Sequence, residues 1–360
     1  MTDDGDKKGL KAAIDQSLTF LEKKRSGASP LPILPEPFGG VFTPEKIQRT
    51  LKLFREVVVR ASDPSDLETQ VFEKFVFVGR PDEDKGPPLL ITGYYEPVFE
   101  GSLEPGAEYR FPIYRRPDDL VEIREESPST GGNGKRKIGR MENGKWVPYF
   151  SRQEIDSQGV LRGKGYELAW LRDPWERFVL HVQGSGQIRM PDGKIWRCGF
   201  AGSNGRAYRS IGQLLVKQGY FPETDLSLQR VRDFLNDHPE KAEEVLNQNE
   251  RYVFFRPLPE GNGPLGSLGV PLTEGRSIAC DHSIYPQGAL AYLIADQALL
   301  KGRGKSVGKQ TVRRFVLNQD TGAAMNGSSR IDLFCGSGER AGLAAGAMRD
   351  SGKIFFLMAK

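Results

Sequence analysis

Residues 311–346, TVRRFVLNQDTGAAMNGSSRIDLFCGSGERAGLAAG, decide the fold class of this chain. The apolar runs at 311–318 and 330–334 are typical of strands. The small-residue segment 339–350, closed by Gly352, predicts a helix before a strand at 354–358. Similar short strands occur upstream. Two β-rich regions with a helical segment between them favour β-barrel domains over a doubly wound sheet.

The remaining sequence extends this pattern. Thr43-Pro44-Glu45 has the signals of a helix start: an N-cap, a proline and an early acid. The polar, glycine-rich residues 125–147 are most simply a solvated loop. The other predicted elements are helices over 8–25, over 211–219, over 226–235 and from Pro239, a Pro-rich linker at 29–32, strands over 71–115 and 166–200 with turns at Asp173-Pro174 and Pro191-Asp192-Gly193, and strand-like residues over 251–300.

The size and charge of the chain narrow the possible functions. Its 360 residues suffice for two domains. The 51 basic and 47 acidic residues leave a net charge of +4, which is too weak a bias to indicate nucleic acid as a partner. No apolar run approaches the roughly 20 residues of a membrane-spanning helix. The polar N-terminus lacks the apolar core of a signal peptide, so we expect a cytosolic protein or one from which a leader is missing.

Neither a metal nor a cofactor is expected. The three cysteines, Cys198, Cys280 and Cys335, and the three histidines lack the spacing of zinc ligands. The glycine-rich turn at 336–342 superficially fits a dinucleotide fingerprint. That fingerprint requires a ribose-binding acid about 20 residues further on, and none follows here.

Three aspartates lie in or at the end of apolar stretches: Asp281 in RSIACD, Asp320 in RRFVLNQD and Asp332 in SRIDLF. A carboxylate in an apolar strand is costly unless its partners or a tuned ionisation compensate. A single such acid often makes only a structural hydrogen bond. Three of them in one region, two beside glycine-rich turns, indicate a functional site.

The sequence Asp320-Thr321-Gly322 also permits a different interpretation. Aspartic proteases place a carboxylate on such a turn, and their chemistry needs two carboxylates that share a proton. Asp350-Ser351-Gly352 is the other sequence of this kind, at a predicted helix end. An aspartic protease-like hydrolase using Asp320 and Asp350 is therefore an alternative.

Several turns carry groups suited to sugar binding. Aromatic rings cover the apolar face of a sugar, and amides bind its hydroxyl groups. The candidate residues are Tyr94, Tyr95 and Glu96 at the end of one strand, Gln183, Gly184, Ser185 and Gly186 after a second apolar strand, and Asn204 in a further glycine-rich turn.

Together, several segments closely resemble the membrane-bound lytic murein transglycosylase A family. The resemblance runs from about Leu89 to Lys360, roughly three-quarters of the chain, with the motifs in the same order. Ala323 after the D-T-G motif departs from the family's more usual glycine. The segments include ITGYYEP (91–97), FVLHVQGSGQIRMPDG (178–193), GFAGSNGRAYRSIG (199–212), NQDTGAAMNG (318–327) and RIDLFCGSGERAGLAAG (330–346).

This resemblance implies a mainly β fold with some helix. A discontinuous double-psi β-barrel would comprise residues 1–108 and 251–360, with residues 1–40 poorly assigned. A second, barrel-like β domain inserted over 109–250 would form the other wall of a large groove for peptidoglycan glycan strands. The resemblance and the motifs assign substrate binding to Tyr94, Tyr95, Glu96, Gln183, Gly184, Ser185, Gly186, Asn204 and Thr321.

The implied reaction cleaves the MurNAc-β-1,4-GlcNAc bond and leaves a 1,6-anhydromuramyl end. Asp332 matches the family's catalytic acid, with Asp320 and Asp281 beside it. The C6 hydroxyl of the substrate is the nucleophile, so a single carboxyl group can act first as acid and then as base. This role requires the pKa of Asp332 to lie above its usual value near 3.9, raised by apolar neighbours and by a like charge, foremost that of Asp320.

The resemblance also implies a location and a set of partners. The full-length protein would be a lipoprotein on the periplasmic face of the outer membrane, with residues 1–28 as a spacer after the anchor. We expect a monomer that uses no metal, cofactor or nucleic acid. A glycan-binding module that has lost catalysis is a further alternative, which the presence of the acid at Asp332 disfavours.

Overall fold

A computed structural model describes residues 3–25, 34–81, 86–125, 135–259, 263–301 and 305–360, so the linker expected at 29–32 lies outside the described residues. The chain divides into unit 1, residues 1–96 and 261–360, and unit 2, residues 97–260. The domain boundaries predicted from the sequence are 108/109 and 250/251. The positions differ because residues 98–102 and 253–257 are strands of the unit 2 sheet.

Unit 1 combines one end of the chain with the other. Its described elements are α1 (Lys7–Arg25), α2 (Pro44–Arg60), α3 (Pro64–Lys74), β1 (Phe75–Val78), β2 (Leu89–Glu96), β12 (Ser277–Ala279), β13 (Leu290–Lys301), β14 (Lys305–Asp320), β15 (Arg330–Ser337), α9 (Gly338–Gly346) and β16 (Arg349–Ala359).

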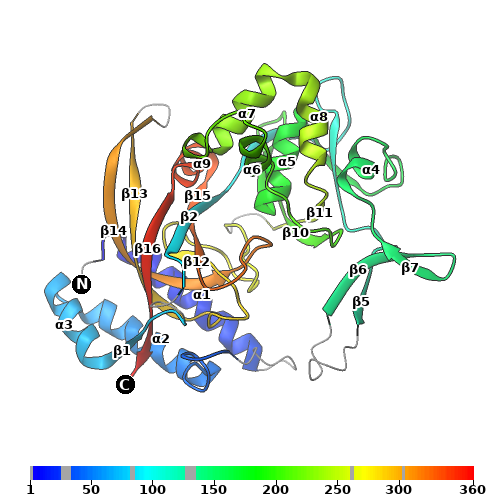
Figure 1. Ribbon diagram of the computed structural model, residues 1–360. Helices are drawn as coiled ribbons and strands as arrows, with labels where there is room; N and C mark the ends of the chain where they lie inside the picture. Colours follow the sequence, from blue (N-terminus) through cyan, green and yellow to red (C-terminus); the bar gives the residue numbers. More distant parts are fainter. Residues whose placement is uncertain (1–2, 26–33, 82–85, 126–134, 260–262, 302–304) are drawn as a thin grey trace. The chain divides into compact units, whose positions relative to one another are not determined.

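A closed barrel forms the centre of unit 1 (Figure 1). Among the described residues its strands follow the order β16-β13-β14-β12-β15-β2, and β2 pairs again with β16. The β12–β14 and β15–β2 pairs are parallel, and the other pairs are antiparallel. The structure thus confirms a β-barrel made from both ends of the chain.

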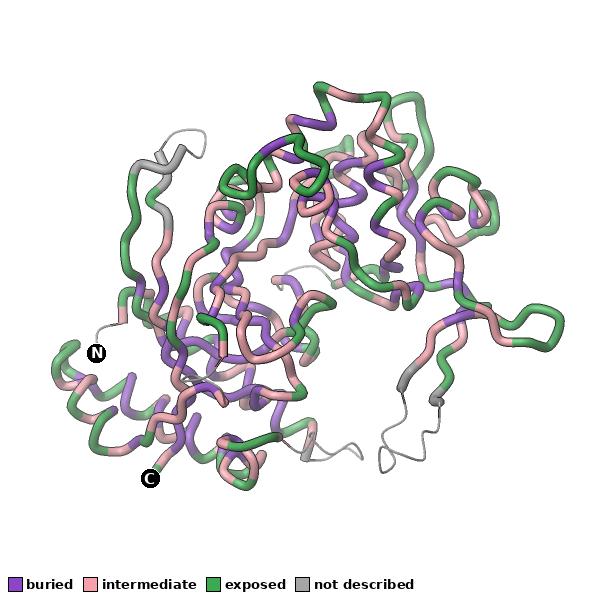
Figure 2. The backbone as a smooth tube through the Cα atoms, in the orientation of Figure 1, coloured by how far each residue is buried: buried purple, intermediate pink, exposed green. Residues whose placement is uncertain are grey.

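Helices α1 and α2 complete the core of unit 1. The buried face of α2 carries Ile47, Leu51, Phe54 and Val58 at helical spacing. Buried residues recur along these helices in Figure 2. The ring centroids of Phe54 and of Phe315 on β14 are 4.7 Å apart. Both helices are therefore integral parts of the barrel unit.

Unit 2 contains two further sheets. The six-stranded sheet has the order β11-β10-β9-β3-β8-β4, and a bridge between Arg115 and Phe255 links its two edges, which gives it a barrel-like form. The described elements are β3 (Val98–Ser102), β4 (Phe111–Tyr114), β5 (Val121–Glu125), β6 (Lys135–Glu142), β7 (Lys145–Pro148), α4 (Arg152–Asp156), β8 (Glu167–Leu171), α5 (Pro174–Gln183), β9 (Ser185–Arg189), β10 (Ile195–Ser203), α6 (Ile211–Lys217), a 3-10 turn (Glu223–Asp225), α7 (Leu228–Asp237), α8 (Pro239–Asn247) and β11 (Val253–Pro257).

The loop predicted over 125–147 is wrong where the structure describes it. β5, β6 and β7 form a three-stranded sheet, and residues 126–134 lie outside the described part. Glu142 pairs with Lys145 around Asn143 and Gly144, whose φ values are 50° and 74°. Two central residues with positive φ form a tight hairpin turn, and Asn-Gly is its strongest sequence signal. Because the strands on both sides of this turn are mostly polar, the segment resembles a solvated loop in the sequence.

The strands predicted over 166–200 are present as β8, β9 and β10, but residues 174–183 between them form the helix α5, which was not predicted. Asp173 caps α5 by accepting a hydrogen bond from the Trp175 backbone N–H at 2.7 Å, and Pro174 occupies the first turn. Gly184, at φ 78°, ends the helix. Most of α5 is buried, so its apolar run lacks the polar face that distinguishes a surface helix from a strand.

Two smaller errors involve unit 1. Residues 71–74, expected in a strand, belong to α3. The helix expected over 339–350 ends at Gly346, and Gly352 lies within β16 rather than at a helix end. A Cβ atom at Gly352 would lie 2.6 Å from the backbone oxygen of Ile294, so close strand contact explains this glycine.

Gly93→Ala is expected to lower the free energy of unfolding by about 1–3 kcal/mol, because an added Cβ would lie 2.6 Å from the Ala345 Cα of α9. Urea titration measures this change. Gly346→Ala is the matched control at the end of the same helix, where an added Cβ contacts nothing within 4 Å. An equal loss in both variants would contradict close packing of β2 against α9.

Candidate active site

One face of β2 carries the polar groups of the site. Side chains alternate along a strand, so Thr92, Tyr94 and Glu96 lie on one face, and Gly93 and Tyr95 lie on the other. In the parallel pair with β15, Thr92 lies beside Asp332 and Tyr94 beside Phe334. The Tyr94 and Phe334 rings are 5.3 Å apart, which confirms that these side chains share a face.

Asp332 is held by two donors on this face. Thr92 Oγ1 donates a hydrogen bond to Asp332 Oδ1. Arg330, two residues earlier on the same strand, donates from Nε to Oδ1 at 2.9 Å and from Nη2 to Oδ2 at 3.1 Å. A bidentate arginine fixes a carboxylate in both position and plane. The Asp332 side chain retains 13% exposure, so it can be reached from solvent.

Asp320 is more deeply enclosed. Tyr94 OH donates to Asp320 Oδ2 at 3.0 Å, and the backbone N–H groups of Ser267 and Thr321 donate to Oδ1 at 2.8 and 2.9 Å. Burial raises the pKa of Asp320 to about 6, although these donors oppose the change. Burial, followed by the charges of Asp320 and Asp332, raises the pKa of Tyr94 well above its usual range. Tyr94 therefore remains a hydrogen-bond donor.

Strand β12 brings the third acid to the same place. Ala279 on β12 pairs with Asp320 on one side and with Asp332 on the other. The two acids are thus two strands apart, a backbone separation of roughly 10 Å. Asp281 follows β12 and accepts hydrogen bonds from Ser283 N–H at 2.9 Å and Gly327 N–H at 2.8 Å.

The Cys280 thiol, next to Asp281, responds to all three acids. Burial raises the pKa of this thiol well above its usual range, and the charges of Asp281, Asp320 and Asp332 add to the effect. The structure therefore gathers the three predicted aspartates in unit 1. Each has its own hydrogen-bond donors, and none of the described hydrogen bonds joins one aspartate to another.

The other residues of unit 1 that were predicted to bind substrate do not all lie beside the acids. Tyr95 lies on the opposite face of β2 from Tyr94, where its ring is 2.9 Å from a Cβ built at Gly342 of α9. Glu96 is fully buried and accepts a hydrogen bond from Ser337 Oγ at 2.7 Å. Thr321 is exposed beside Asp320. Tyr95 and Glu96 thus support the barrel, and Tyr94 and Thr321 border the acids.

The remaining candidates lie in unit 2. Gln183 ends α5, and Gly184 is the left-handed residue that terminates this helix. Ser185 and Gly186 begin β9, and a Cβ at Gly186 would lie 2.4 Å from Leu180 Cδ1, so packing accounts for that glycine. Direct substrate contacts by these four residues stay predictions.

Asn204 is a structural residue of unit 2. Its side chain is 1% exposed and donates to the backbone oxygens of Phe150 and Glu250 at 2.9 and 2.8 Å. Its Oδ1 accepts from the Tyr252 backbone N–H at 2.9 Å. These bonds occupy both ends of the amide, so the structure assigns Asn204 to positioning the chain rather than to binding hydroxyl groups.

Sequence reasoning missed five residues that donate hydrogen bonds to the acids: Thr92, Arg330, Ser267, Ser283 and Gly327. The alternation rule places Arg330 on the same face as Asp332, since only Ile331 lies between them on the strand. Thr92 and Ser267 lie far from the acids in sequence, and only the barrel topology brings them close.

The alternative pair Asp320 and Asp350 does not form a shared-proton site. Asp350 forms an ion pair with Lys309. It also pairs across β16–β2 with Ile91, on the opposite face of β2 from Thr92. No described hydrogen bond joins the Asp320 and Asp350 carboxylates. Within the described residues, no group of three or more His, Cys, Asp or Glu side chains is arranged to hold a metal ion.

The chain is similar to known proteins over most of its length. Residues 90–256 match the MltA specific insert domain, and residues 276–358 match the 3D domain. A membrane-bound lytic murein transglycosylase A from Vibrio cholerae is 31% identical over 316 residues, which cover 87% of this chain and 76% of the relative. The chain belongs to the membrane-bound lytic murein transglycosylase A family.

Other members of the transglycosylase A family agree with this assignment. The Escherichia coli K12 protein is 35% identical over 75% of this chain and 65% of its own length. The crystal structure of a membrane-bound lytic murein transglycosylase from Agrobacterium tumefaciens has a TM-score of 0.78 at 30% identity, covering 96% of this chain and 92% of that one. Escherichia coli MltA with bound chitohexaose gives 0.66 at 28% identity, covering 92% and 95%.

The relatives carry the description membrane-bound. Among the described residues of this transglycosylase A family member, none of the helices combines the length and the apolar character needed to cross a membrane.

Proposed function

We infer that this protein cleaves peptidoglycan as a lytic transglycosylase, at the MurNAc-β-1,4-GlcNAc bond. The family membership supports the activity and the substrate class. The observation that carries the mechanism is the position of Asp332, which is partly exposed and held by Thr92 and Arg330. Asp320 lies two strands away in the same sheet, and Asp281 follows the strand between them, which supports a role for both beside Asp332.

The proposed reaction needs one carboxyl group. Asp332 donates its proton to the glycosidic oxygen as the bond from that oxygen to C1 breaks. The C6 hydroxyl of the same sugar then attacks C1, and its proton passes to the Asp332 carboxylate. No water is consumed, and the acid is regenerated. Because the nucleophile belongs to the substrate, the entropic cost of capturing a separate nucleophile is avoided.

The neighbours of Asp332 have distinct roles in this scheme. Arg330 stabilises the carboxylate form, which is the form that takes the proton from the C6 hydroxyl. Tyr94, held by Asp320, keeps its hydroxyl proton beside the site.

The location follows from the substrate. Polymeric peptidoglycan exists outside the inner membrane, so we propose that the full-length protein acts in the periplasm, attached to the outer membrane by an N-terminal lipid. The relatives' description as membrane-bound supports attachment. Monomeric behaviour and the absence of a nucleic-acid partner stay predictions.

Mass spectrometry of digested murein tests the reaction. The expected disaccharide products are lighter by one water than those of hydrolysis, because an internal hydroxyl replaces water as the nucleophile. Products with hydrolytic masses would contradict transglycosylation. Binding of murein with no cleavage would support the glycan-binding alternative.

A further inference from the structure

Unit 2 contains a cavity that is lined by residues of this unit alone. It has a volume of about 460 Å³ and lies between β4, α4, α5 and α8. This volume is in the range of small-molecule sites, which are mostly apolar with a few placed polar groups. The apolar part of its lining comes from Phe111, Pro112, Pro174, Pro239, Ala242 and Leu246.

The buried Arg177 lines this cavity, and the buried Arg152, which is outside the lining, contacts the same acid. Arg177, whose side chain is 8% exposed, donates from Nη2 to Asp156 Oδ2 at 2.9 Å. Arg152 binds the same oxygen at 3.4 Å, and Tyr252 OH donates to Asp156 Oδ1 at 3.1 Å. One carboxylate thus faces two guanidinium groups. Arg177 Nε is buried and lacks a hydrogen-bond partner among the described residues.

His181 does not alter this balance of charge. Burial, followed by the charges of Arg152 and Arg177, lowers the pKa of His181 well below its usual range. The neutral ring accepts a hydrogen bond at Nδ1 from Arg152 Nη1 at 2.9 Å, since arginine can only donate. The cluster of Arg152, Arg177, Asp156 and His181 therefore keeps one net positive charge.

Two more arginines, Arg110 and Arg162, line the cavity and are exposed. Neither forms an ion pair within the described part of the chain. Arg110 instead lies over the Phe111 ring, 5.6 Å from its centroid. The acidic groups in the lining are Asp156, which is already paired, and Glu243. The arginine pocket, as we call this cavity, therefore presents free cationic groups beside apolar surface.

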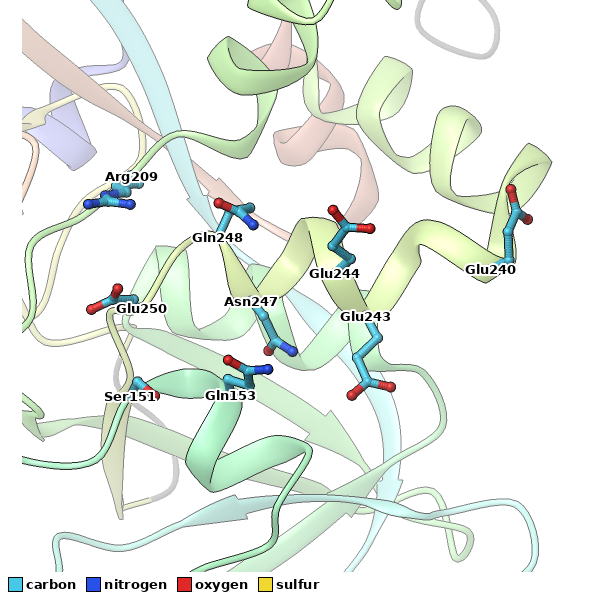
Figure 3. Close-up of a pocket in the computed structure, with 9 residues that line it drawn as sticks. All are labelled: Ser151, Gln153, Arg209, Glu240, Glu243, Glu244, Asn247, Gln248 and Glu250. Atoms are coloured by element: carbon cyan, nitrogen blue, oxygen red, sulfur yellow. The ribbon is translucent and has the colours of Figure 1, made fainter.

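The neighbouring pocket on α8 has the opposite character. It has a volume of about 480 Å³, and Figure 3 shows its side chains. Glu240, Glu243, Glu244 and Glu250 line it with a single arginine, Arg209. Like charges repel, so an anion is excluded from this pocket and favoured in the arginine pocket.

We propose that the arginine pocket binds a carboxylate carried on a short, partly apolar chain, of the kind found in the peptide side chains of murein. Arginine forms charge-assisted, bidentate hydrogen bonds with carboxylates, and the apolar lining accommodates the adjoining chain. A free acidic peptide offers the same chemistry. The proposal that the carboxylate belongs to murein rests on the proposed function. The proposal that the pocket binds a carboxylate does not.

Calorimetry with the tripeptide L-Ala-γ-D-Glu-meso-diaminopimelate tests the binding. The wild-type protein is expected to bind this peptide at least tenfold more tightly than its fully amidated form. The Arg110→Ala/Arg162→Ala variant should lose at least tenfold in affinity, and both positions are exposed, so folding is not at risk. The matched control Arg209→Ala removes an exposed arginine from the acidic pocket and should change affinity by less than twofold.

Absence of peptide binding, equal binding of both forms, or an equal loss in Arg209→Ala would overturn the proposal. Enzyme kinetics then distinguish a carboxylate of murein from that of a free peptide. The double variant should raise KM for peptide-bearing murein but not for peptide-free glycan strands. An unchanged KM together with peptide binding assigns the pocket to free peptides. Failure of the wild type to release anhydro products would refute the proposed function alone.

Discussion

Asp332→Asn is expected to abolish release of 1,6-anhydromuramyl products while leaving the fold intact. Asparagine retains the shape of the side chain, and its oxygen can still accept from Thr92 Oγ1 and Arg330 Nε, although its amide nitrogen cannot accept from Arg330 Nη2. It cannot donate and recover a proton as the carboxyl group does. Loss of general acid–base catalysis typically costs 100- to 10,000-fold in rate. Chromatography of muropeptides from digested murein measures the loss, and thermal unfolding checks the fold.

Asp350→Asn is the matched control for this experiment. It removes the same functional group from the same barrel, at a residue on the opposite face of β2 from Thr92. Its activity should stay close to that of the wild type. Activity of Asp332→Asn within about tenfold of wild type would exclude Asp332 as the acid. Equal losses in both variants would show that the loss is not specific to Asp332.

Asp320→Asn should stabilise the protein at alkaline pH relative to wild type. Burial raises the pKa of Asp320 to about 6, above the ordinary value of 3.8. The uncharged form of Asp320 therefore contributes to the free energy of unfolding. This contribution is fully present below pH 3.8 and is lost as the pH rises through 6. The difference corresponds to about 3 kcal/mol at pH 8, since one pKa unit equals about 1.4 kcal/mol. Asparagine remains uncharged and avoids this loss.

Urea titration of both proteins at pH 4 and pH 8 measures this change. Between pH 4 and pH 8, the free energy of unfolding of the variant should rise relative to that of the wild type by about 2.4 kcal/mol, because part of the full difference is already lost at pH 4. Asp296→Asn, which removes an acid that accepts from Thr311 Oγ1 on the barrel surface, reports the effect of net charge alone. A constant difference between Asp320→Asn and wild type at both pH values would show that Asp320 is not destabilised by ionisation.

Much of the site could be predicted from sequence because its acids interrupt apolar strands. Asp281, Asp320 and Asp332 were identified on that basis, and the barrel brings them together. Adjacent residues on a strand face opposite sides, so Tyr94 and Tyr95 could not both border the acids. Counting alternate positions would have found Arg330 and placed Tyr95 on the opposite face of β2 from Tyr94.

Other features could not be derived from local sequence. The apolar run of α5 resembles a strand because the helix is buried on most sides. The role of Asn204 depends on backbone groups of Phe150 and Glu250, about 50 residues away in each direction. Such contacts result from the tertiary fold. The same holds for Ser267 N–H, which reaches Asp320 from a loop.

The pairing of β2 with β15 also sets when the enzyme can become active during synthesis. Thr92 and Asp332 are 240 residues apart in the sequence. Unit 2, residues 97–260, is continuous, so all of its chain has been made about 100 residues before the barrel strands are complete. Domains generally fold as units during translation, N-terminal ones first. Asp332 can therefore meet Thr92 only after β15 has been made, and a chain that stops between residue 260 and β15 contains all of unit 2 but lacks this pair.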